Sequence, residues 1–368
     1  MVCVHNFEKR DAMRAAMIQT LRVEGYRVGM SLVEIPPSVC DTVCGELDDS
    51  DAGVLEHVVM SIKEGRWRDA ETWRDARGKI ERNWVFRKRI YPPFDHRGSN
   101  QPVDVLDQYL KVLARDRPHT LKGLSTYLYQ ISKRSLQRDA DRVQIPVIRT
   151  LGSLVTPKMR EVIESAFDGK FFNDYGTAEL GPISAECSAR NGMHIFGTQF
   201  IVEVVDQNLK PVADGELGEV LVTDLVNHSM PLIRYRVGDL GRIKHEPCTC
   251  GSSLPRLWIE GRIHDAFATK DGSWISSHYI ADQLFQYEWL HDFQLVEKRG
   301  NRLELSFVTE DKSDPLTQKK KLRSLLIEMF GDQRDIRVRE THSISPEPGG
   351  KFRWVKPLPF VNVLSNAT

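Results

Sequence analysis

The fold of this chain is decided by the stretch Phe171-Phe172-Asn173-Asp174-Tyr175-Gly176-Thr177-Ala178-Glu179-Leu180-Gly181-Pro182. Two aromatic residues lead into a polar break, where a ring, a glycine, a hydroxyl and a carboxylate follow within five residues. A buried strand that ends in such a cluster delivers its side chains to the carboxyl edge of a sheet, where α/β proteins bind ligands. The stretch therefore predicts a ligand site, and a plain turn after a strand is the alternative.

Four positions of the stretch carry groups that suit a nucleotide. Tyr175 offers a flat face for a base, and Gly176 offers bare backbone. Thr177 and Glu179 offer hard oxygen atoms, which a magnesium ion prefers as ligands. A nucleotide with magnesium is therefore the first ligand class to consider.

Strands and helices alternate around this stretch. Helices are expected over residues 8–24 and 103–114, and a third is capped by Thr156 with Pro157 at its first position and ends near residue 167. Strands are expected over 28–35, within 121–127, over 145–150 and over 170–173. This alternation predicts an α/β fold with a doubly wound, mostly parallel sheet.

The pattern changes after residue 199. Short alternating strands over 200–206 and 218–223 predict an antiparallel, barrel-like unit appended to the sheet. After Arg262 the chain restarts as a small α+β unit. Its expected elements are a helix over 277–289, a hairpin of 293–298 with 303–308, a helix over 316–330 and a strand over 334–339. We therefore predict two domains, 1–262 and 263–368.

The composition excludes several function classes. The chain has 368 residues with 51 basic and 51 acidic side chains, so it lacks the basic surplus typical of partners of nucleic acids or membrane surfaces. No apolar run reaches membrane-spanning length, and the amino terminus lacks the apolar core of a secretory signal. We expect a cytoplasmic protein. Six cysteines in a chain of this length do not predict a disulfide framework.

Three further motifs follow the organising stretch in order. They are Arg234-Tyr235-Arg236-Val237-Gly238-Asp239-Leu240, Glu260-Gly261-Arg262-Ile263-His264-Asp265 and Pro348-Gly349-Gly350-Lys351-Phe352-Arg353. In this order and spacing the four motifs resemble the adenylate-forming superfamily of acyl-CoA synthetases, and most of all its phenylacetate–CoA ligase and capsule-biosynthesis branch. The resemblance extends from about Arg89 to Arg353. It implies that the carboxy-terminal domain is a mobile lid, with a hinge at His264, where aspartate or lysine is usual.

The resemblance also implies roles for single residues in a reaction of ATP. Asp239 would accept hydrogen bonds from both ribose hydroxyls, because one carboxylate can accept two donors. Tyr175 would stack on the adenine, Thr177 would touch the α-phosphate and Glu179 would hold magnesium. A turn aspartate after Gly238 is the alternative for Asp239.

Four more residues receive roles from the same resemblance. Gly152 and Ser153 match the loop that passes under the purine, and Arg262 matches an arginine that contacts ribose and phosphate. Lys351 matches the lysine that the small domain brings to the α-phosphate, where an ammonium group would stabilise the transition state. An ordinary strand–helix loop and a solvent-exposed lysine are the alternatives for residues 152–153 and 351.

Three cysteines and one histidine form a candidate metal set. Cys187 is followed by His194 in one short segment, and Cys248 and Cys250 lie in a C-x-C-G turn downstream. Three thiols and one imidazole complete the tetrahedral shell of a structural zinc ion. Similar residues occur in the branch that the chain resembles. The alternative is three unrelated buried cysteines and a surface histidine.

One feature of the superfamily is missing from the sequence. Its enzymes carry a Ser/Thr/Gly-rich loop that wraps the β- and γ-phosphates, and no such stretch occurs here. The chain is expected to begin just after that loop, which would expose apolar surface for a partner or a homo-oligomer to cover. The phosphate loop therefore bears directly on whether the chain is active.

Three hypotheses for function stay open. The first is an ATP-dependent acid–CoA ligase that forms an acyl-adenylate and then a thioester with coenzyme A. Its substrate would be a small carboxylic acid, and an aryl acid is the default of the family. The second is an adenylyltransferase on the same fold. The third is a catalytically impaired remnant or binding module.

Overall fold

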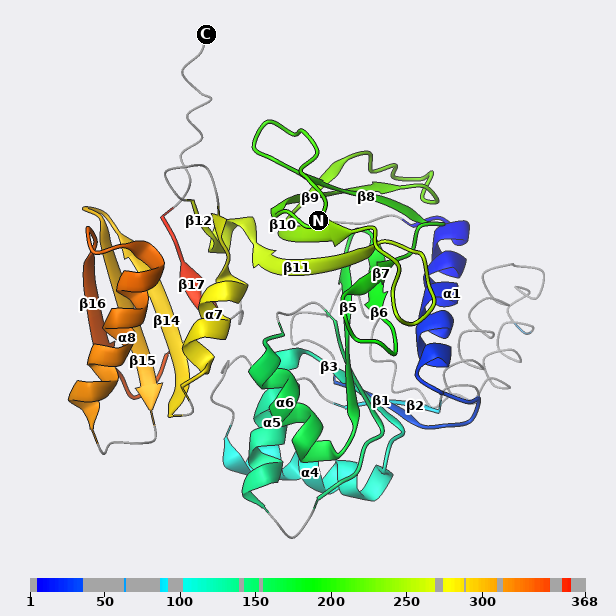
Figure 1. Ribbon diagram of the computed structural model, residues 1–368. Coiled ribbons are helices and arrows are strands. Elements are labelled where there is room, and N and C mark those ends of the chain that lie inside the picture. Colours follow the sequence, from blue (N-terminus) through cyan, green and yellow to red (C-terminus); the bar gives the residue numbers. More distant parts are fainter. Residues whose placement is uncertain are drawn as a thin grey trace.

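The structure is a computed structural model that describes residues 5–35, 63, 87–91, 102–138, 142–151, 155–268, 274–287, 289–309, 314–344 and 353–358. Two sheets of different size organise these residues (Figure 1). Three of the predicted site residues, Gly152, Ser153 and Lys351, lie outside the described ranges.

The larger sheet has eleven strands in the order β2-β1-β3-β4-β5-β6-β7-β11-β10-β9-β8 within the described residues. Its first five strands are parallel to one another. They are β1 (Leu32–Ile35), β2 (Lys88–Ile90), β3 (Thr120–Gly123), β4 (Val147–Leu151) and β5 (Lys170–Thr177). The helices α4 (Val103–Asp116), α5 (Ser125–Gln137) and α6 (Pro157–Phe167) lie together beside these strands (Figure 1). The predicted α/β fold with a parallel sheet is confirmed.

The remaining six strands run antiparallel and continue the same sheet. They are β6 (Gly181–Glu186), β7 (Met193–Ile195), β8 (Phe200–Val205), β9 (Gly218–Asp224), β10 (Tyr235–Lys244) and β11 (Arg256–Arg262). The predicted antiparallel unit is therefore present, and the hairpin of β5 with β6 joins it to the parallel strands. That hairpin is the organising stretch of the sequence.

The residues predicted to begin or end helices α6 and α1 (Phe7–Val23) do so in the structure. The Thr156 side chain accepts a hydrogen bond from the Met159 N–H at 3.2 Å, and Pro157 fills the first position of α6. The helix ends at Asp168, which adopts the left-handed conformation with φ of 47°. Helix α1 ends before Gly25, which has φ of 81°. These helices are therefore specified by residues within a few positions of their ends.

Helix α1 is held against the antiparallel strands by buried polar contacts as well as packing. Lys9 Nζ lies 2.9 Å from Asp224 Oδ2, and neither side chain is exposed to solvent. A Cβ atom added at Gly181 would meet the Met13 side chain at 2.6 Å, so α1 lies directly behind the start of β6. The helix therefore supports the β5–β6 hairpin from the side.

The smaller sheet has four strands in the order β16-β15-β14-β17. They are β14 (Leu290–Lys298), β15 (Arg302–Thr309), β16 (Asp335–Glu340) and β17 (Val355–Lys356), with helices α7 (Ser277–Phe285) and α8 (Pro315–Phe330). A 3₁₀ turn (Ile263–Asp265) and the short pair β12 (Phe267–Ala268) and β13 (Trp274–Ile275) connect it to the large sheet. The predicted hairpin and long helix are confirmed, whereas α7 ends four residues before the predicted Trp289.

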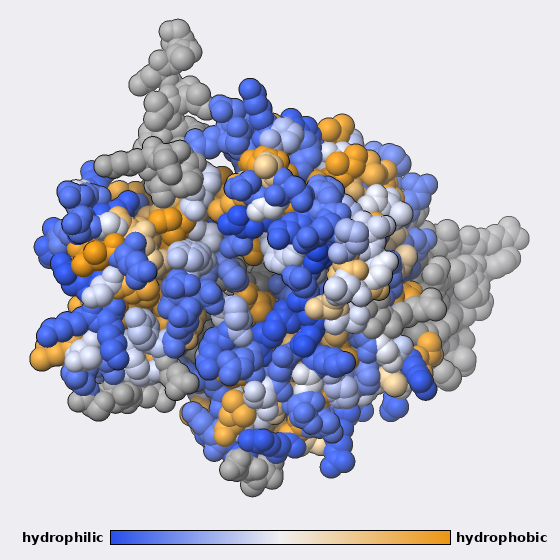
Figure 2. Space-filling model, viewed as in Figure 1, coloured by the Kyte–Doolittle hydropathy of each residue, from blue (hydrophilic) through white to orange (hydrophobic). Residues whose placement is uncertain are grey.

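Among the described residues, three large hydrophobic clusters fill these layers, and a small fourth one contains Leu21, Tyr26 and Leu32. The parallel strands share one with α4, α5 and α6, the antiparallel strands enclose a second, and the small sheet has its own. Strand β5 joins the first two, because Phe171 belongs to one and Tyr175 to the other. The space-filling view shows a mostly hydrophilic face with apolar residues in small groups (Figure 2). None of the described helices is both long and apolar enough to span a membrane.

Candidate functional site

The strand that enters the site is four residues longer than the sequence predicted. The sequence placed its end at Asn173, whereas β5 continues to Thr177 and the turn comprises residues 178–180. The extension pairs with β6, and the register shifts between Tyr175 and Gly176. Any residue other than glycine at 176 would place its Cβ 2.4 Å from the Gly181 carbonyl oxygen. Gly176 is therefore required by the tight hairpin itself.

Three predicted nucleotide residues meet at one point of the sheet. The Tyr175 hydroxyl donates to Asp239 Oδ2 at 2.6 Å, and Arg262 Nε lies 3.0 Å from Asp239 Oδ1. Asp239 on β10 pairs directly with Arg262 on β11. Tyr175 and Asp239 are 7% and 5% exposed, whereas the Arg262 side chain is 58% exposed. We call these three residues the site cluster.

Burial dominates the electrostatics of the site cluster. It raises the pKa of Asp239, against the opposing effects of Arg262 and of the hydrogen bond from Tyr175. The carboxylates of Asp265 and Glu179 raise it further. The pKa of Tyr175 is also raised, first by burial and then by the negative charge of Asp239. The cluster thus holds a buried carboxylate whose charge is only partly compensated, which is typical of binding and catalytic sites.

The end of β5 and the hairpin turn carry the two residues predicted to contact phosphate and magnesium. Thr177 Oγ1 accepts a hydrogen bond from the Leu180 N–H at 3.2 Å, and both Thr177 and Glu179 are half-buried. The Tyr235 hydroxyl lies 3.5 Å from Glu179 Oε1. The carboxylate of Glu179 therefore lies near the site cluster, where a divalent cation would meet oxygen ligands.

The carboxy-terminal segment reaches the same region through Arg353. Its Nε donates to Asp265 Oδ1 at 2.7 Å, and its Nη2 donates to the His264 carbonyl oxygen at 3.1 Å. Arg353 follows the predicted catalytic lysine, Lys351, by two residues. The chain just after that lysine is therefore tied to the turn that follows Arg262.

Two contacts were not predicted from the sequence. The hydrogen bond of Tyr175 to Asp239 joins residues 64 positions apart, and that of Tyr235 to Glu179 joins residues 56 apart. Tyr235 lies in the same motif as Asp239, which is the signal that could have marked it. For Tyr175 the sequence predicted stacking on a base, and the structure adds a polar contact through its hydroxyl.

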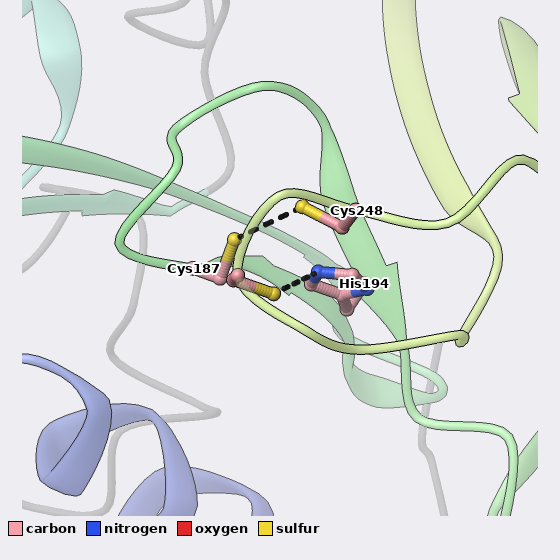
Figure 3. A group of neighbouring side chains, drawn as sticks. Cys187, His194 and Cys248 are labelled. Carbon is pink, nitrogen blue, oxygen red and sulfur yellow. Dashed lines mark hydrogen bonds between the residues drawn. The ribbon is translucent and has the colours of Figure 1, made fainter.

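The predicted metal set comes together as one cluster. Cys187 follows β6, His194 lies on β7, and Cys248 and Cys250 lie in the loop between β10 and β11. Their four donor atoms all lie within 4.8 Å of one another. Figure 3 shows Cys187 facing Cys248, with the His194 ring beside them.

The spacing of these atoms fits zinc. The sulfur atoms of Cys187 and Cys248 are 3.7 Å apart, and the Cys250 sulfur lies 3.3 Å from His194 Nε2. Ligands of a tetrahedral zinc ion, with Zn–S of about 2.3 Å and Zn–N of about 2.0 Å, are separated by similar distances of about 3.5 to 3.8 Å. His194 Nδ1 lies 3.2 Å from the Leu254 carbonyl oxygen, a partner that leaves Nε2 free to bind a metal.

The thiols of this cluster differ in their ease of ionisation. Burial raises the pKa of Cys187 to about 11. Burial acts in the same direction on Cys248, but hydrogen bonds from the backbone and thiol of Cys250 and from His194 outweigh it and lower the pKa to about 6. One thiol is therefore ready to ionise near neutral pH, as a first metal ligand must.

Comparison with known proteins shows what this chain is similar to. The family model described as "CapK C-terminal domain" matches residues 267–357. Phenylacetate-coenzyme A ligase of Thermus thermophilus is 32% identical over 165 residues, which cover 44% of this chain and 37% of the relative. Protein CapK of Staphylococcus aureus is 24% identical over 253 residues, 68% of this chain and 55% of the relative. These matches confirm that the chain resembles the adenylate-forming superfamily, in the branch of phenylacetate–CoA ligase and CapK.

Solved structures show the same fold. A 2-hydroxyisobutyryl-CoA ligase in the postadenylation state superimposes with a TM-score of 0.67 at 21% identity, covering 91% of this chain and 67% of that ligase. The amide bond synthetase McbA of Marinactinospora thermotolerans gives 0.61 at 17% identity, covering 93% of this chain and 63% of McbA. The chain itself spans between 37% and 55% of the length of the two curated relatives above.

Proposed function

We propose that this chain is an ATP-dependent acid–CoA ligase of the phenylacetate–CoA ligase type. The observation that carries the proposal is the site cluster. Residues from three separate motifs, Tyr175, Asp239 and Arg262, meet around one buried carboxylate. The half-buried Thr177 lies at the end of β5, and the half-buried Glu179 lies in the turn that follows. The relatives named phenylacetate-coenzyme A ligase support the reaction class at modest identity.

The proposed reaction has two steps. The carboxylate oxygen of an acid attacks the α-phosphorus of ATP, and the bond to pyrophosphate breaks to leave an acyl-adenylate. The sulfur of coenzyme A then attacks the acyl carbon, its proton leaves to a base, and AMP departs with the bonding electrons. Both steps depend mainly on positioning and on neutralising phosphate charge.

The residues divide these tasks. Asp239 would accept the ribose hydroxyls, Arg262 would contact ribose and phosphate, and Thr177 would donate to the α-phosphate. Glu179 would hold magnesium, which neutralises phosphate charge when bound. Arg262 suits phosphate because its guanidinium is always charged and its side chain reaches solvent.

Three parts of the proposal rest on the family resemblance and lie outside the described residues. They are the loop residues Gly152 and Ser153 under the purine, and Lys351 at the α-phosphate. The division into a large domain of residues 1–262 and a lid of residues 263–368, with a hinge at His264, belongs to the same proposal. The separate sheet and core of the carboxy-terminal part support that division.

The substrate that we propose is a small carboxylic acid, with an aryl acid as the first candidate. Two structural neighbours were solved with acyl-adenylates, one of 2-hydroxyisobutyrate and one of anthranilate. McbA is named an amide bond synthetase, so the same fold also serves transfer to an acceptor other than coenzyme A. We further propose a cytoplasmic location, because six cysteines in a chain of 368 residues do not predict a disulfide framework.

We also propose that Cys187, His194, Cys248 and Cys250 hold a structural zinc ion. Four protein ligands would close the coordination shell, so zinc would join the β6–β7 segment to the β10–β11 loop rather than bind substrate. The purified chain should contain about one zinc per molecule by elemental analysis. Cys248→Ser should lose most of it and melt at a lower temperature, whereas Cys3→Ser should change neither. A full zinc content in Cys248→Ser would contradict the site.

The experiment that tests the main proposal is calorimetric titration of ATP with magnesium, followed by an acid panel with coenzyme A. We expect saturable ATP binding that Asp239→Ala abolishes, then formation of an acyl-CoA with release of AMP and pyrophosphate. Acid-dependent pyrophosphate release without a thioester would favour an adenylyltransferase. Absence of ATP binding by a folded chain would refute the ligase and leave a remnant or binding module.

A further inference from the structure

The hydroxyl of Tyr175 has a partner that stacking on adenine does not explain. It donates to Asp239 Oδ2 at 2.6 Å, and both residues are almost fully buried. A phenylalanine would offer a base the same ring face without this hydrogen bond. The hydroxyl therefore serves the carboxylate of Asp239, on a different strand, in addition to anything that the ring contacts.

The carboxylate of Asp239 has one hydrogen bond, from Tyr175, and one ion pair, with Arg262. A carboxylate has about four acceptor sites, two on each oxygen. Tyr175 takes one site on Oδ2, and Arg262 approaches Oδ1 at 3.0 Å. Within the described part of the chain these are the contacts of the carboxylate, so each oxygen keeps an acceptor site, which matches the two neighbouring hydroxyls of a ribose.

The tyrosine also fixes the direction of those open sites. The Arg262 side chain is 58% exposed, so its hold on Asp239 is partly screened by solvent. The Tyr175 ring is packed in the apolar cluster of the antiparallel strands and cannot follow a turning carboxylate. The buried hydrogen bond is therefore the contact that sets the rotation of the carboxyl plane.

We propose that Tyr175 is a positioning residue that acts through Asp239 on the ribose hydroxyls of the nucleotide. This inference rests on the proposed function, because it needs a nucleotide with its ribose at Asp239. Without the tyrosine hydroxyl, the carboxylate turns toward Arg262 or toward the nearest donor, and the two open sites no longer match the ribose. The expected loss in ATP affinity is about tenfold, or about 1.4 kcal/mol.

A matched control exists elsewhere in the chain. The Tyr91 hydroxyl donates to Asp116 Oδ2 at 2.6 Å, and Arg115 Nε donates to Asp116 Oδ1 at 2.7 Å. Tyr91 is 8% exposed and its hydroxyl also lies 3.4 Å from the Val112 carbonyl oxygen, so Tyr91→Phe removes a part-buried tyrosine–aspartate hydrogen bond. The two variants should have similar effects on stability and different effects on nucleotide binding.

The test compares magnesium complexes of ATP and of 2′,3′-dideoxy-ATP by titration calorimetry. Each nucleotide is titrated into the unaltered chain, Tyr175→Phe and Tyr91→Phe, with the weaker ligand measured by displacement. We expect Tyr175→Phe to lower the affinity for ATP about tenfold and the affinity for dideoxy-ATP less than about twofold. The reason is that only ATP carries the hydroxyls that Asp239 binds. Tyr91→Phe should change neither affinity.

Each other outcome overturns the inference. Equal weakening of both nucleotides means that Tyr175 acts on the base, and no weakening means that its hydroxyl is idle. A Tyr175→Phe chain without a cooperative melting transition means that the hydroxyl serves the fold. Failure of the unaltered chain to bind ATP is a separate result, since it refutes the proposed function first and this inference with it.

Discussion

Two clusters, each with one tyrosine, one aspartate and one arginine, lie in different halves of the molecule. One is the site cluster of Tyr175, Asp239 and Arg262, and the other is the remote cluster of Tyr91, Asp116 and Arg115. In both, the tyrosine hydroxyl donates to the aspartate Oδ2 at 2.6 Å. Arginine Nε lies 3.0 Å from Oδ1 in the site cluster and 2.7 Å in the remote cluster.

The pKa of the aspartate shifts in opposite directions in the two clusters. The hydrogen bond from Arg115 lowers the pKa of Asp116, burial opposes it, and Arg89 adds a second cation. Burial raises the pKa of Asp239, and the neighbouring carboxylates of Asp265 and Glu179 add to it. The remote cluster is a satisfied ion pair, whereas the site cluster keeps a buried anion that a ligand can still satisfy.

The largest expected difference is in ATP affinity. Asparagine at position 239 would lack the negative charge of aspartate and keep only one acceptor oxygen. Asp239→Asn should therefore lower the affinity for ATP about hundredfold, or about 2.7 kcal/mol. Asp116→Asn should change the affinity less than about twofold, because its hydrogen bonds lie within the fold. Calorimetric titration of both variants measures this. Similar losses in both would mean that neither cluster is the ribose site.

A second difference lies between two glycines of the large sheet, Gly176 on β5 and Gly123 on β3. Gly176→Ala would force a Cβ to within 2.4 Å of the Gly181 carbonyl oxygen, so the hairpin that carries Tyr175 must shift. We expect it to lower the free energy of unfolding by about 2 kcal/mol. At Gly123 on β3 the nearest atom to an added Cβ is 3.4 Å away, so Gly123→Ala should change stability by less than about 0.5 kcal/mol.

Urea unfolding of the two alanine variants measures this difference. A tolerated alanine at 176 would show that the hairpin is looser than its close backbone approach indicates. Titration with ATP then separates the effect of the substitution on nucleotide binding from its effect on the stability of the fold. Gly176→Ala should lower the affinity for ATP even under conditions in which the variant is fully folded, because Tyr175 and Thr177 flank the altered position.

Features that depend on neighbouring residues were predictable from the sequence. The start of α6 follows from Thr156 and Pro157, whose cap and fixed φ act within one turn. The grouping of Cys187 and His194 with Cys248 and Cys250 followed from residue types and from the C-x-C-G turn. The membership of Asp239 and Arg262 in one site followed from ordered motifs, which carry information that local patterns lack.

Features that depend on strand pairing were not predictable. Tyr175 reaches Asp239 only because β5, β6, β7, β11 and β10 are neighbours in that order. No local pattern encodes that order, since β11 lies between β7 and β10 in space but follows both in sequence. The end of β5 was misplaced because Asn173 and Asp174 are polar, and polar residues usually mark a turn rather than a strand that continues into a hairpin.

The smallest expected difference is in the pH dependence of stability. Burial raises the pKa of Asp239 in the folded chain, so the folded state holds that proton more tightly than the unfolded state. Its carboxylate opposes folding once the pH has passed through the raised pKa. Asp239→Asn should therefore raise the free energy of unfolding at neutral pH by up to about 1 kcal/mol. This gain in stability should disappear below about pH 4, where Asp239 is protonated in both the folded and the unfolded chain.

Asp116 should behave in the opposite sense. Its lowered pKa means that the carboxylate stabilises the fold above its ordinary pKa, and that this contribution is lost as the pH falls through the lowered value. Asp116→Asn should lower the free energy of unfolding at neutral pH by less than about 1 kcal/mol, because Arg89 and Arg115 are more than half exposed and solvent screens them. Urea unfolding of both asparagine variants at about pH 7 and about pH 4 tests the two signs. The same sign in both variants would remove the distinction between the clusters, because Asp239 would then be as well compensated as any structural ion pair.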